Sequence, residues 1–327
     1  MHSLVAAALT GGLFGSALSI SGVANPRIIL DQLQFTDFHM LLTFLTASAC
    51  SAPVFAVANY AKFATIPRKS STTYGWANRF DGNVTGGLLL GLGMGLTGAC
   101  PGTMVVQAAG GVRNAWTMLA GALLGGISYV KWSRSHPKQA TRTCDPERSS
   151  STAKGKDTSQ RLLLGYEVIA ILTIIAVNEL APRGQYPVHP VLGGILIGLA
   201  QAASVLVSRK PLGVSAAYED VGNFFWALVK GERLPSAQNS VFLASMFAGA
   251  KVIMHLMLFT SAGLQTSGSA SIFSSLLSGF LLVFGARLGG GCTTGHGISG
   301  MSSLGVGSFV SVSSMFGGGI ALAMLSP

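Results

Sequence analysis

Long apolar runs separated by short polar segments alternate along the whole chain. Most of these runs reach the roughly 20 residues that an α-helix needs to cross a bilayer. They cover residues 4–23, 38–60, 84–111, 115–130, 162–180, 190–207, 241–260, 272–285 and 304–325. The pattern therefore predicts an all-α integral membrane protein with about nine transmembrane helices.

Two stretches differ from a simple span, and we expect short re-entrant half-helices in both. The run 84–111 is interrupted by a Cys-Pro-Gly tripeptide at residues 100–102, and the segment 214–229 is short and holds two adjacent carboxylates. Irregular backbone at membrane depth is stable only where it lines a protected cavity. Such a cavity is therefore expected beside the tripeptide.

The composition agrees with a membrane protein. Only 10% of the residues are charged, whereas a soluble domain carries about 25%. The mean hydropathy is +0.54, and the chain contains 43 glycines. The first apolar run holds several glycines and leads into Pro26, which is unlike a signal peptide, so we expect it to be a retained span.

Positive charge gathers in a few loops. The segment 132–161 is rich in Ser, Thr, Lys and Arg and has almost no apolar residues, so it is expected to be a disordered linker. Further basic positions lie on the same side if the spans alternate: Lys62, Arg68, Lys69, Arg79, Arg209, Lys210, Lys230 and Arg233. Because cytoplasmic loops carry an excess of Lys and Arg, we expect the linker and the N-terminus in the cytoplasm, with the protein in the plasma membrane.

A basic linker also raises the alternative of nucleic-acid binding. A solvated loop close to anionic lipid explains the charge better, and no nucleic-acid partner is expected. Cys144 lies in this linker and is expected to be an incidental exposed thiol. Cys50 lies within an apolar run, where a cysteine behaves as a small hydrophobic residue.

The two halves of the chain repeat one motif. GMGLTGACPGT at residues 93–103 aligns without a gap with GARLGGGCTTGH at residues 285–296, and this alignment pairs Cys100 with Cys292. Matched position and flanking glycines favour a role for both cysteines in lining a pathway. The alternative is that the glycines only permit close helix packing.

The repeat suggests a division of the chain into a first membrane repeat (1–131), the linker, and an extra span with the second repeat (162–327). The extra span at 162–180 reverses the direction of the second copy, which predicts an inverted repeat with a binding site at the midplane. Glu167 and Glu179 are placed near the ends of this extra span and receive no role.

The residues around each cysteine favour an anion. Pro101 suits the first turn of a helix, and Thr293 or Thr294 could cap another, so unpaired N–H groups would point towards the thiols. Two helix N-termini form an anion site. Because sulfur is soft and the thiol is a weak donor and acceptor, a small sulfur oxyanion fits better than an amine or a sugar.

Several nearby polar residues have two readings each. His296 either donates to the anion or relays a proton, or else it caps a helix. Arg287 attracts the anion at the site entrance, or it reaches the membrane interface. Lys251 and His255 share one face of an apolar span, where cations often have a function, although Lys251 can also reach the interface. Gln107 and Thr103 face the pathway or make an ordinary helix contact.

At this point the motifs resemble a known family. Gly-Ala-Cys100-Pro-Gly-Thr together with Gly-Gly-Cys292-Thr-Thr-Gly-His-Gly-Ile-Ser-Gly is similar to the pair of cysteine loops of the YeeE/YedE sulfur-transport family, whose characterised bacterial members import thiosulfate. The resemblance runs from Gly11 to about Gly319. It implies an hourglass-like inverted repeat whose cysteines pass the anion inward by S–H to sulfur hydrogen bonds, without covalent turnover.

One departure from the family concerns the first loop of the first half, where the bacterial importers carry a further cysteine. Ser19 and Ser21 occupy this region here, and a hydroxyl is harder and less polarisable than a thiol. The expected substrate-binding residues are Cys100, Cys292, Gly98, Gly102, Thr103, Gly291, Thr293, Thr294, His296, Arg287, Ser19 and Ser21.

The sequence as a whole predicts a permease for a small inorganic sulfur anion, with thiosulfate favoured and no enzyme activity. The chain has no CxxC pair, no metal-ligand spacing and no ATP-binding motif, so neither metal nor cofactor is expected. A soluble sulfur-accepting protein is a possible partner. The alternative function is an intramembrane thiol or persulfide redox enzyme that uses Cys100 and Cys292, whose Cα atoms would then have to lie within about 7 Å.

Overall fold

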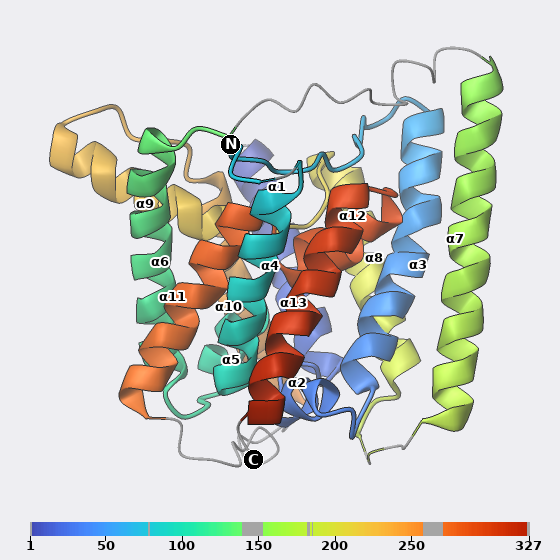
Figure 1. The fold of residues 1–327 in the computed structure, drawn as a ribbon, viewed down its shortest axis with the longest axis horizontal. Coiled ribbons are helices and arrows are strands. Elements are labelled where there is room, and N and C mark those ends of the chain that lie inside the picture. Colours follow the sequence, from blue (N-terminus) through green and yellow to red (C-terminus); the bar gives the residue numbers. More distant parts are fainter. Residues whose placement is uncertain are drawn as a thin grey trace.

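The structure is a computed structural model that describes residues 2–77, 79–138, 153–181, 184, 186–257 and 271–325. Its regular elements in these residues are helices, as the sequence predicts (Figure 1). The first half holds α1 (His2–Ile20), α2 (Pro26–Leu33), α3 (His39–Tyr60), α4 (Asp81–Thr97), α5 (Thr103–Ala109) and α6 (Ala115–Ser135). The second half holds α7 (Ala153–Leu180), α8 (Pro190–Ser208), α9 (Ser215–Lys230), α10 (Gln238–Leu256), α11 (Ile272–Gly289), the π-helix η3 (Thr294–Ile298), α12 (Ser299–Ser302) and α13 (Val306–Leu325).

Seven helices in the described residues are long and apolar enough to cross a membrane, which confirms the expected multi-pass membrane protein. They are α1, α3, α7, α8, α10, α11 and α13. The sequence predicted about nine spans, and the two that differ are α4 and α6. Helix α4 has 17 residues, or about 26 Å at the usual rise, and it packs between α11 and α13.

Of the two stretches expected to be irregular, one is broken in the structure and the other is a continuous helix. The run 84–111 is broken as predicted, because α4 ends at Thr97 and α5 begins at Thr103. The segment 214–229 forms one continuous helix, α9, so the half-helices expected there are absent. Helix also covers both ends of the predicted linker, whose residues 139–152, with Cys144, lie outside the described part of the chain.

The packing of the helices follows the repeat. Helix α1 packs along α10, and its counterpart α8 packs along α3; likewise α4 contacts α13, and its counterpart α11 contacts α6. Gln238 at the start of α10 donates to the Ser3 carbonyl near the start of α1, and Thr43 of α3 donates to the Pro190 carbonyl that begins α8. The pair α1 and α10 and the pair α3 and α8 therefore start at opposite ends of the bundle (Figure 1). An inverted repeat produces this arrangement.

Helices α4 and α11 cross at the centre of the bundle through small residues. A Cβ added to Gly86 would lie 2.6 Å from the Gly285 carbonyl oxygen, and one added to Gly285 would lie 2.7 Å from that of Gly86. Backbones approach this closely only where side chains are absent. Farther along the crossing, the hydroxyls of Thr97 and Ser278 form a hydrogen bond of 2.7 Å.

A buried amide fixes the end of α11. Asn83 is fully buried, and its Nδ2 donates to the carbonyls of Gly289 and Gly307 and to Ser311 Oγ at 2.8–3.2 Å. Its Oδ1 accepts from the backbone N–H of Thr72 at 2.7 Å. One side chain of α4 therefore joins the loop before it to α11 and α13, directly before the second cysteine loop.

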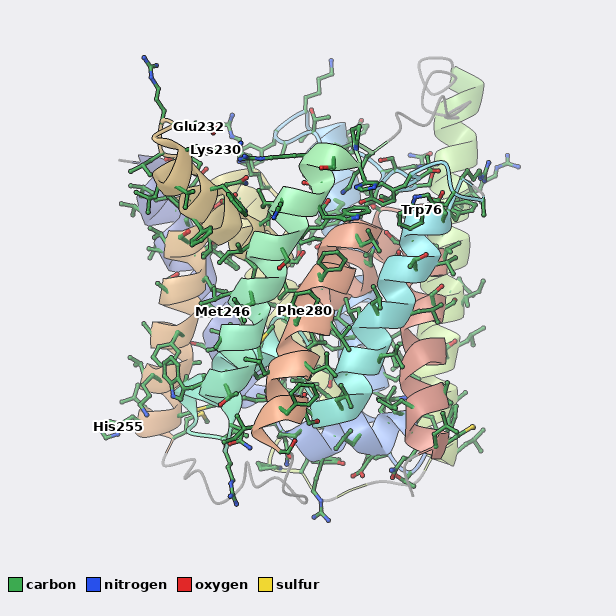
Figure 2. All side chains as sticks on the ribbon, turned by 60° about the vertical axis from the view of Figure 1, so that its left-hand side comes forward. Trp76, Lys230, Glu232, Met246, His255 and Phe280 are labelled. Atoms are coloured by element: carbon green, nitrogen blue, oxygen red, sulfur yellow. The ribbon has the colours of Figure 1, made fainter. Side chains whose placement is uncertain are left out.

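The two ends of the bundle differ in charge. The loops that follow α3, α8 and α9, which hold basic residues, lie at the end where the N-terminus is drawn in Figure 1. Figure 2 shows Trp76, Lys230 and Glu232 at this end and His255 at the opposite end. The side chains that the sequence expected on one face of the membrane are thus gathered at one end of the molecule.

Candidate functional site

Two matched glycines open the two cysteine loops. Gly98 ends α4 with φ +64, and Gly290, its partner in the repeat, ends α11 with φ +87. Residues other than glycine rarely adopt this left-handed conformation. Each loop therefore turns away from its helix at the same point and places a cysteine two residues later. Cys100 and Cys292 are both buried and both free thiols.

The Cys100 sulfur is held by the first turn of α5. The backbone N–H of Thr103 lies 3.3 Å from Cys100 Sγ, and the Thr103 hydroxyl lies 3.4 Å from it. The same hydroxyl accepts from the Cys100 backbone N–H at 2.8 Å. The expected arrangement, in which N–H groups at a helix start point towards the thiol, is present around Cys100.

The Cys292 sulfur has a comparable set of donors. Thr294 Oγ1 lies 3.0 Å from Cys292 Sγ, and the backbone N–H groups of Gly295 and Ser215 also interact with the sulfur. Ser215 begins α9. A second helix start thus contributes to this site, although no motif in the sequence connects residue 215 with Cys292.

The two loops meet in the interior of the bundle. The Cys100 thiol interacts with the Thr293 side chain and electrostatically with Cys292. Tyr218 of α9 is fully buried beside both cysteines, and its hydroxyl donates to the Pro101 carbonyl at 2.9 Å. A Cβ added to Gly102 would lie 3.8 Å from Thr294 Cγ2. The residues of both loops therefore form one site rather than two.

A buried acceptor atom in this region has no hydrogen-bond partner in the described residues. Besides Thr293 Oγ1, whose partner is the Cys100 thiol described above, the buried atom without a partner is Gln107 Oε1. The other end of the Gln107 amide donates to the Gly98 carbonyl at 3.0 Å, so this side chain lies against the first cysteine loop. Thr103, which is fully buried, contacts Cys100 directly.

Lys69 brings a positive charge to the second loop. Its Nζ donates to the Gly295 carbonyl at 3.1 Å and attracts Cys292 electrostatically. Burial in this position lowers the pKa of Lys69 to about 8, against the opposing effect of Cys292. Gly291 leaves the necessary room, because a Cβ at that position would overlap the lysine ammonium.

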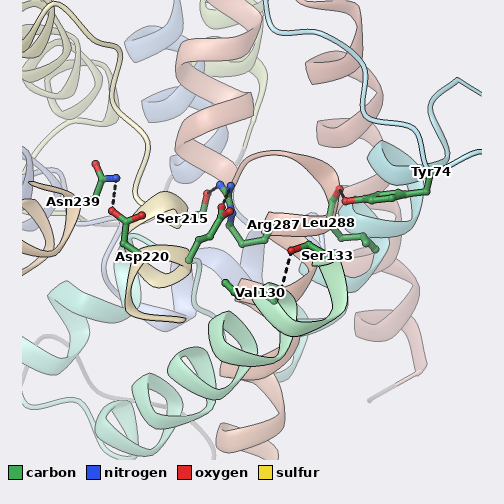
Figure 3. Close-up of polar contacts among 9 residues, drawn as sticks. Tyr74, Val130, Ser133, Ser215, Asp220, Asn239, Arg287 and Leu288 are labelled. Atoms are coloured by element: carbon green, nitrogen blue, oxygen red, sulfur yellow. Dashed lines mark hydrogen bonds and ion pairs between the residues drawn. The ribbon is translucent and has the colours of Figure 1, made fainter. Parts of the chain in front are cut away.

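Arg287 adds a second cation from α11. It forms an ion pair with Glu219 and lies 3.5 Å from Ser215 Oγ, and Figure 3 shows it pointing towards Ser215. Only 16% of its side chain is exposed, so it points into the protein rather than to the membrane interface. Arg287 and Lys69 both interact with Cys292, and in the described residues Glu219 is the carboxylate that pairs with Arg287.

His296 is occupied by the protein itself. Its Nε2 lies 3.2 Å from the Gly289 carbonyl and must donate to it, so its Nδ1 accepts from the Ser308 hydroxyl at 3.0 Å. Both ring nitrogens thus bridge the ends of α11 and α13. This geometry favours the structural reading of His296 over donation to an anion.

Ser19 and Ser21 hydrogen-bond to their own helix. Ser19 donates to the Gly15 carbonyl at 2.8 Å, and Ser21 donates to that of Leu18 at 2.9 Å. The Ser21 carbonyl in turn accepts from His39 Nε2 at 2.7 Å. Neither hydroxyl contacts a cysteine in the described part of the chain, although Leu18 lies next to Gly102.

The remaining candidates lie outside the site. Lys251 donates to the Ala109 carbonyl at the end of α5, at 3.1 Å, which is a capping contact. His255 lies at the end of α10, away from the basic end of the bundle (Figure 2). Cys50 lies in the middle of α3 and is half-buried, as expected of a small hydrophobic residue.

The site is closed in this conformation. The cavity beside Cys292, lined also by Gly291 and His296, has a volume of about 10 Å³. A single water needs roughly this much space. An anion of several atoms therefore reaches the thiols only after the surrounding helices move apart.

Sequence reasoning missed three groups at this site: Lys69, Tyr218 and Ser215. Lys69 was counted as one of many basic loop residues, and neither Tyr218 nor Ser215 belongs to a recognisable motif. Lys69 could have been identified from its position in the loop before α4. In an inverted repeat, the loops next to the matched helices come together at the pseudo-two-fold axis.

Comparison with known proteins decides the family. The family model described as sulphur transport matches residues 21–321. The chain belongs to this family. A probable transporter of Xylella fastidiosa (strain Temecula1) is 32% identical over 114 residues, which are 35% of this chain and 76% of the relative. A second probable transporter, of strain 9a5c, is 31% identical over 115 residues, with the same coverage. The expected kinship with a sulfur-transport family is confirmed, and the chain is a multi-pass membrane transporter.

Proposed function

We propose that this transporter moves a small sulfur-containing anion, with thiosulfate as the favoured substrate, along a pathway in which Cys100 and Cys292 are the binding thiols. The observation that carries the proposal is the meeting of two matched, buried, free thiols in one site with converging donors. A sulfur oxyanion needs soft contacts for its terminal sulfur and N–H or O–H donors for its oxygens. Both kinds of group are present here.

Each thiol would hold the anion by a hydrogen bond from S–H to its sulfur. The N–H groups of Thr103, Gly295 and Ser215 and the threonine hydroxyls would replace the water that the anion loses. Charged groups in a low-dielectric interior are costly unless such donors surround them. No bond to sulfur forms or breaks, so each thiol is ready for the next anion.

The cations give the pathway its selectivity for anions. Lys69 and Arg287 interact with Cys292 from the basic end of the bundle. With Glu219 paired to Arg287, the ammonium of Lys69 is free to attract a negative ligand to the second loop. We propose that this end faces the cytoplasm in the plasma membrane, because the basic loops gather there, and that a soluble sulfur-accepting protein takes the anion on that side.

Uptake of labelled thiosulfate into proteoliposomes tests the proposal. We expect uptake by the wild-type protein that Cys100→Ser and Cys292→Ser each reduce sharply, without loss of the folded, monodisperse protein. Cys50→Ser is the matched control, because the Cys50 side chain lies against Gly198 of α8 and belongs to neither cysteine loop, and it should transport like the wild type. Sulfate, which lacks the soft terminal sulfur, should compete poorly.

The alternatives give different results in the same assay. Unchanged uptake by both cysteine variants would exclude the thiol pathway. No wild-type uptake under any imposed gradient, together with thiol-dependent conversion of the substrate, would instead favour an intramembrane redox enzyme.

A further inference from the structure

Helix α7 carries a carboxylate at membrane depth. The extra span stands at the edge of the bundle in Figure 1 and packs mainly along α3. Glu167 is the eighth residue of the 21-residue apolar span Gln160–Leu180, in the first half of that span. Glu167 faces Cys50, which is near the middle of the 22-residue α3. This carboxylate therefore lies about 10 Å inside the span, counted from its first residue.

The surroundings of Glu167 accept only an uncharged acid. Its Oε1 atom is buried and has no hydrogen-bond partner, and the described residues provide no cation that pairs with it. The titratable group that faces it from α3 is the Cys50 thiol, and on its own helix the neighbouring Tyr166 packs against Phe309 of α13. An ionised carboxylate here would be unpaired in a medium of low dielectric constant, which costs several kcal/mol.

The residue next to Glu167 is connected to the second cysteine loop. The Tyr166 hydroxyl lies 2.6 Å from Ser48 Oγ, and Ser48 donates to the Ile298 carbonyl at 3.2 Å. Because Ser48 has a single proton and uses it on Ile298, Tyr166 must be the donor in the first contact. Ile298 ends the π-helix that follows Cys292. A hydrogen-bonded chain thus runs from α7 to the helical segment that follows the second cysteine loop.

We propose that Glu167 is a proton-binding site, and that its protonation is coupled to anion movement through the chain Tyr166–Ser48–Ile298. The proposal rests on the proposed transport function. With the proton bound, α7 stays packed on α3 and Ile298 keeps its hydroxyl donor. Ionised Glu167 is stable only where water reaches it, so loss of the proton separates α7 from α3 and releases the second loop.

A proton carried with the anion would lower the electrical cost of uptake. A membrane potential that is negative inside opposes the inward movement of an anion in proportion to its charge. Each proton that moves inward with the anion cancels one charge and so removes this cost. A carboxyl that does not contact the anion can carry the proton without competing for the site.

The protonated state is tested without transport. A hydrophobic carbodiimide modifies protonated carboxyls in apolar surroundings, and α7 is accessible from the lipid. We expect mass spectrometry of the wild-type protein at neutral pH to find the adduct on Glu167 and none on Glu179, which is exposed at the end of α7. The adduct should be absent from Glu167→Gln. Absence of labelling at Glu167 in the folded wild type would overturn the proposal.

Coupling is tested in proteoliposomes with an imposed proton gradient. The wild type should accumulate thiosulfate faster when the outside is acidic, and Glu167→Gln, which mimics the protonated acid, should keep downhill exchange but lose this stimulation. Glu179→Gln is the matched control and should respond like the wild type. If Glu167→Gln does not fold, Tyr166→Phe interrupts the same chain and should likewise lose the stimulation.

The outcomes separate the two proposals. The coupling would be overturned if wild-type uptake did not depend on the proton gradient, or if uptake by Glu167→Gln still depended on it. Either result would leave the proposed transport function unaffected. Absence of wild-type uptake under every gradient would overturn both.

Discussion

Replacement of Asn83 by alanine is expected to destabilise the protein more than a single lost hydrogen bond would. The Asn83 side chain makes contacts to Thr72, Gly289, Gly307 and Ser311 and is fully buried. Without it, the buried Thr72 N–H loses its acceptor, and a buried unpaired donor costs about 1–3 kcal/mol. The bonds that Nδ2 made to its other partners are lost as well.

The acceptors of Asn83 do not all become unpaired. The Gly289 carbonyl still accepts from Thr72 Oγ1 at 3.1 Å and from His296 Nε2 at 3.2 Å. These remaining bonds limit the total cost, so we expect Asn83→Ala to lower the free energy of unfolding by about 2–4 kcal/mol. Ser311→Ala removes one of three acceptors and should cost about 0.5–1.5 kcal/mol.

Reversible unfolding in mixed detergent micelles measures this difference. The protein is titrated with a denaturing detergent, and the loss of helical signal gives the free energy of unfolding for the wild type and both variants. A matched result for Asn83→Ala and Ser311→Ala would contradict the reasoning, because it would mean that the Thr72 N–H finds another acceptor once the amide is gone.

Two further predictions concern the cysteine loops. With a pKa of about 8, Lys69 is about 90% charged at pH 7 and about 10% at pH 9, so thiosulfate binding to the solubilised protein should weaken as the pH rises through 8. Lys69→Arg, which stays charged over this range, should flatten the decline; equal binding at pH 7 and 9 in the wild type would exclude a role for the Lys69 charge. Gly98→Ala should destabilise the protein more than Gly111→Ala, because both positions have positive φ but only a Cβ at Gly98 meets the Pro26 backbone, while nothing lies within 4 Å of one at Gly111. Strain alone costs about 1 kcal/mol, and equal melting temperatures for the two variants would show that the overlap with Pro26 is relieved without cost.

The hydropathy pattern was sufficient to predict most of the membrane topology. Seven of the predicted spans are helices long enough to cross a bilayer, and the break in the run 84–111 is found where proline and glycine interrupt it. These features are local, because helix length and turn chemistry depend on neighbouring residues. The matched glycines at 98 and 290 also follow from the repeat, since equivalent turns need equivalent backbone angles.

The site itself depended on tertiary structure. The sequence alone determined that two thiols occupy matching loops, and it pointed to a family of sulfur transporters. Only the packed helices decided that Lys69 lies on the second loop, that Arg287 pairs with Glu219, and that both nitrogens of His296 are occupied. Such contacts join residues far apart in the chain, and they depend on how each helix is rotated and shifted against its neighbours, which no local pattern records.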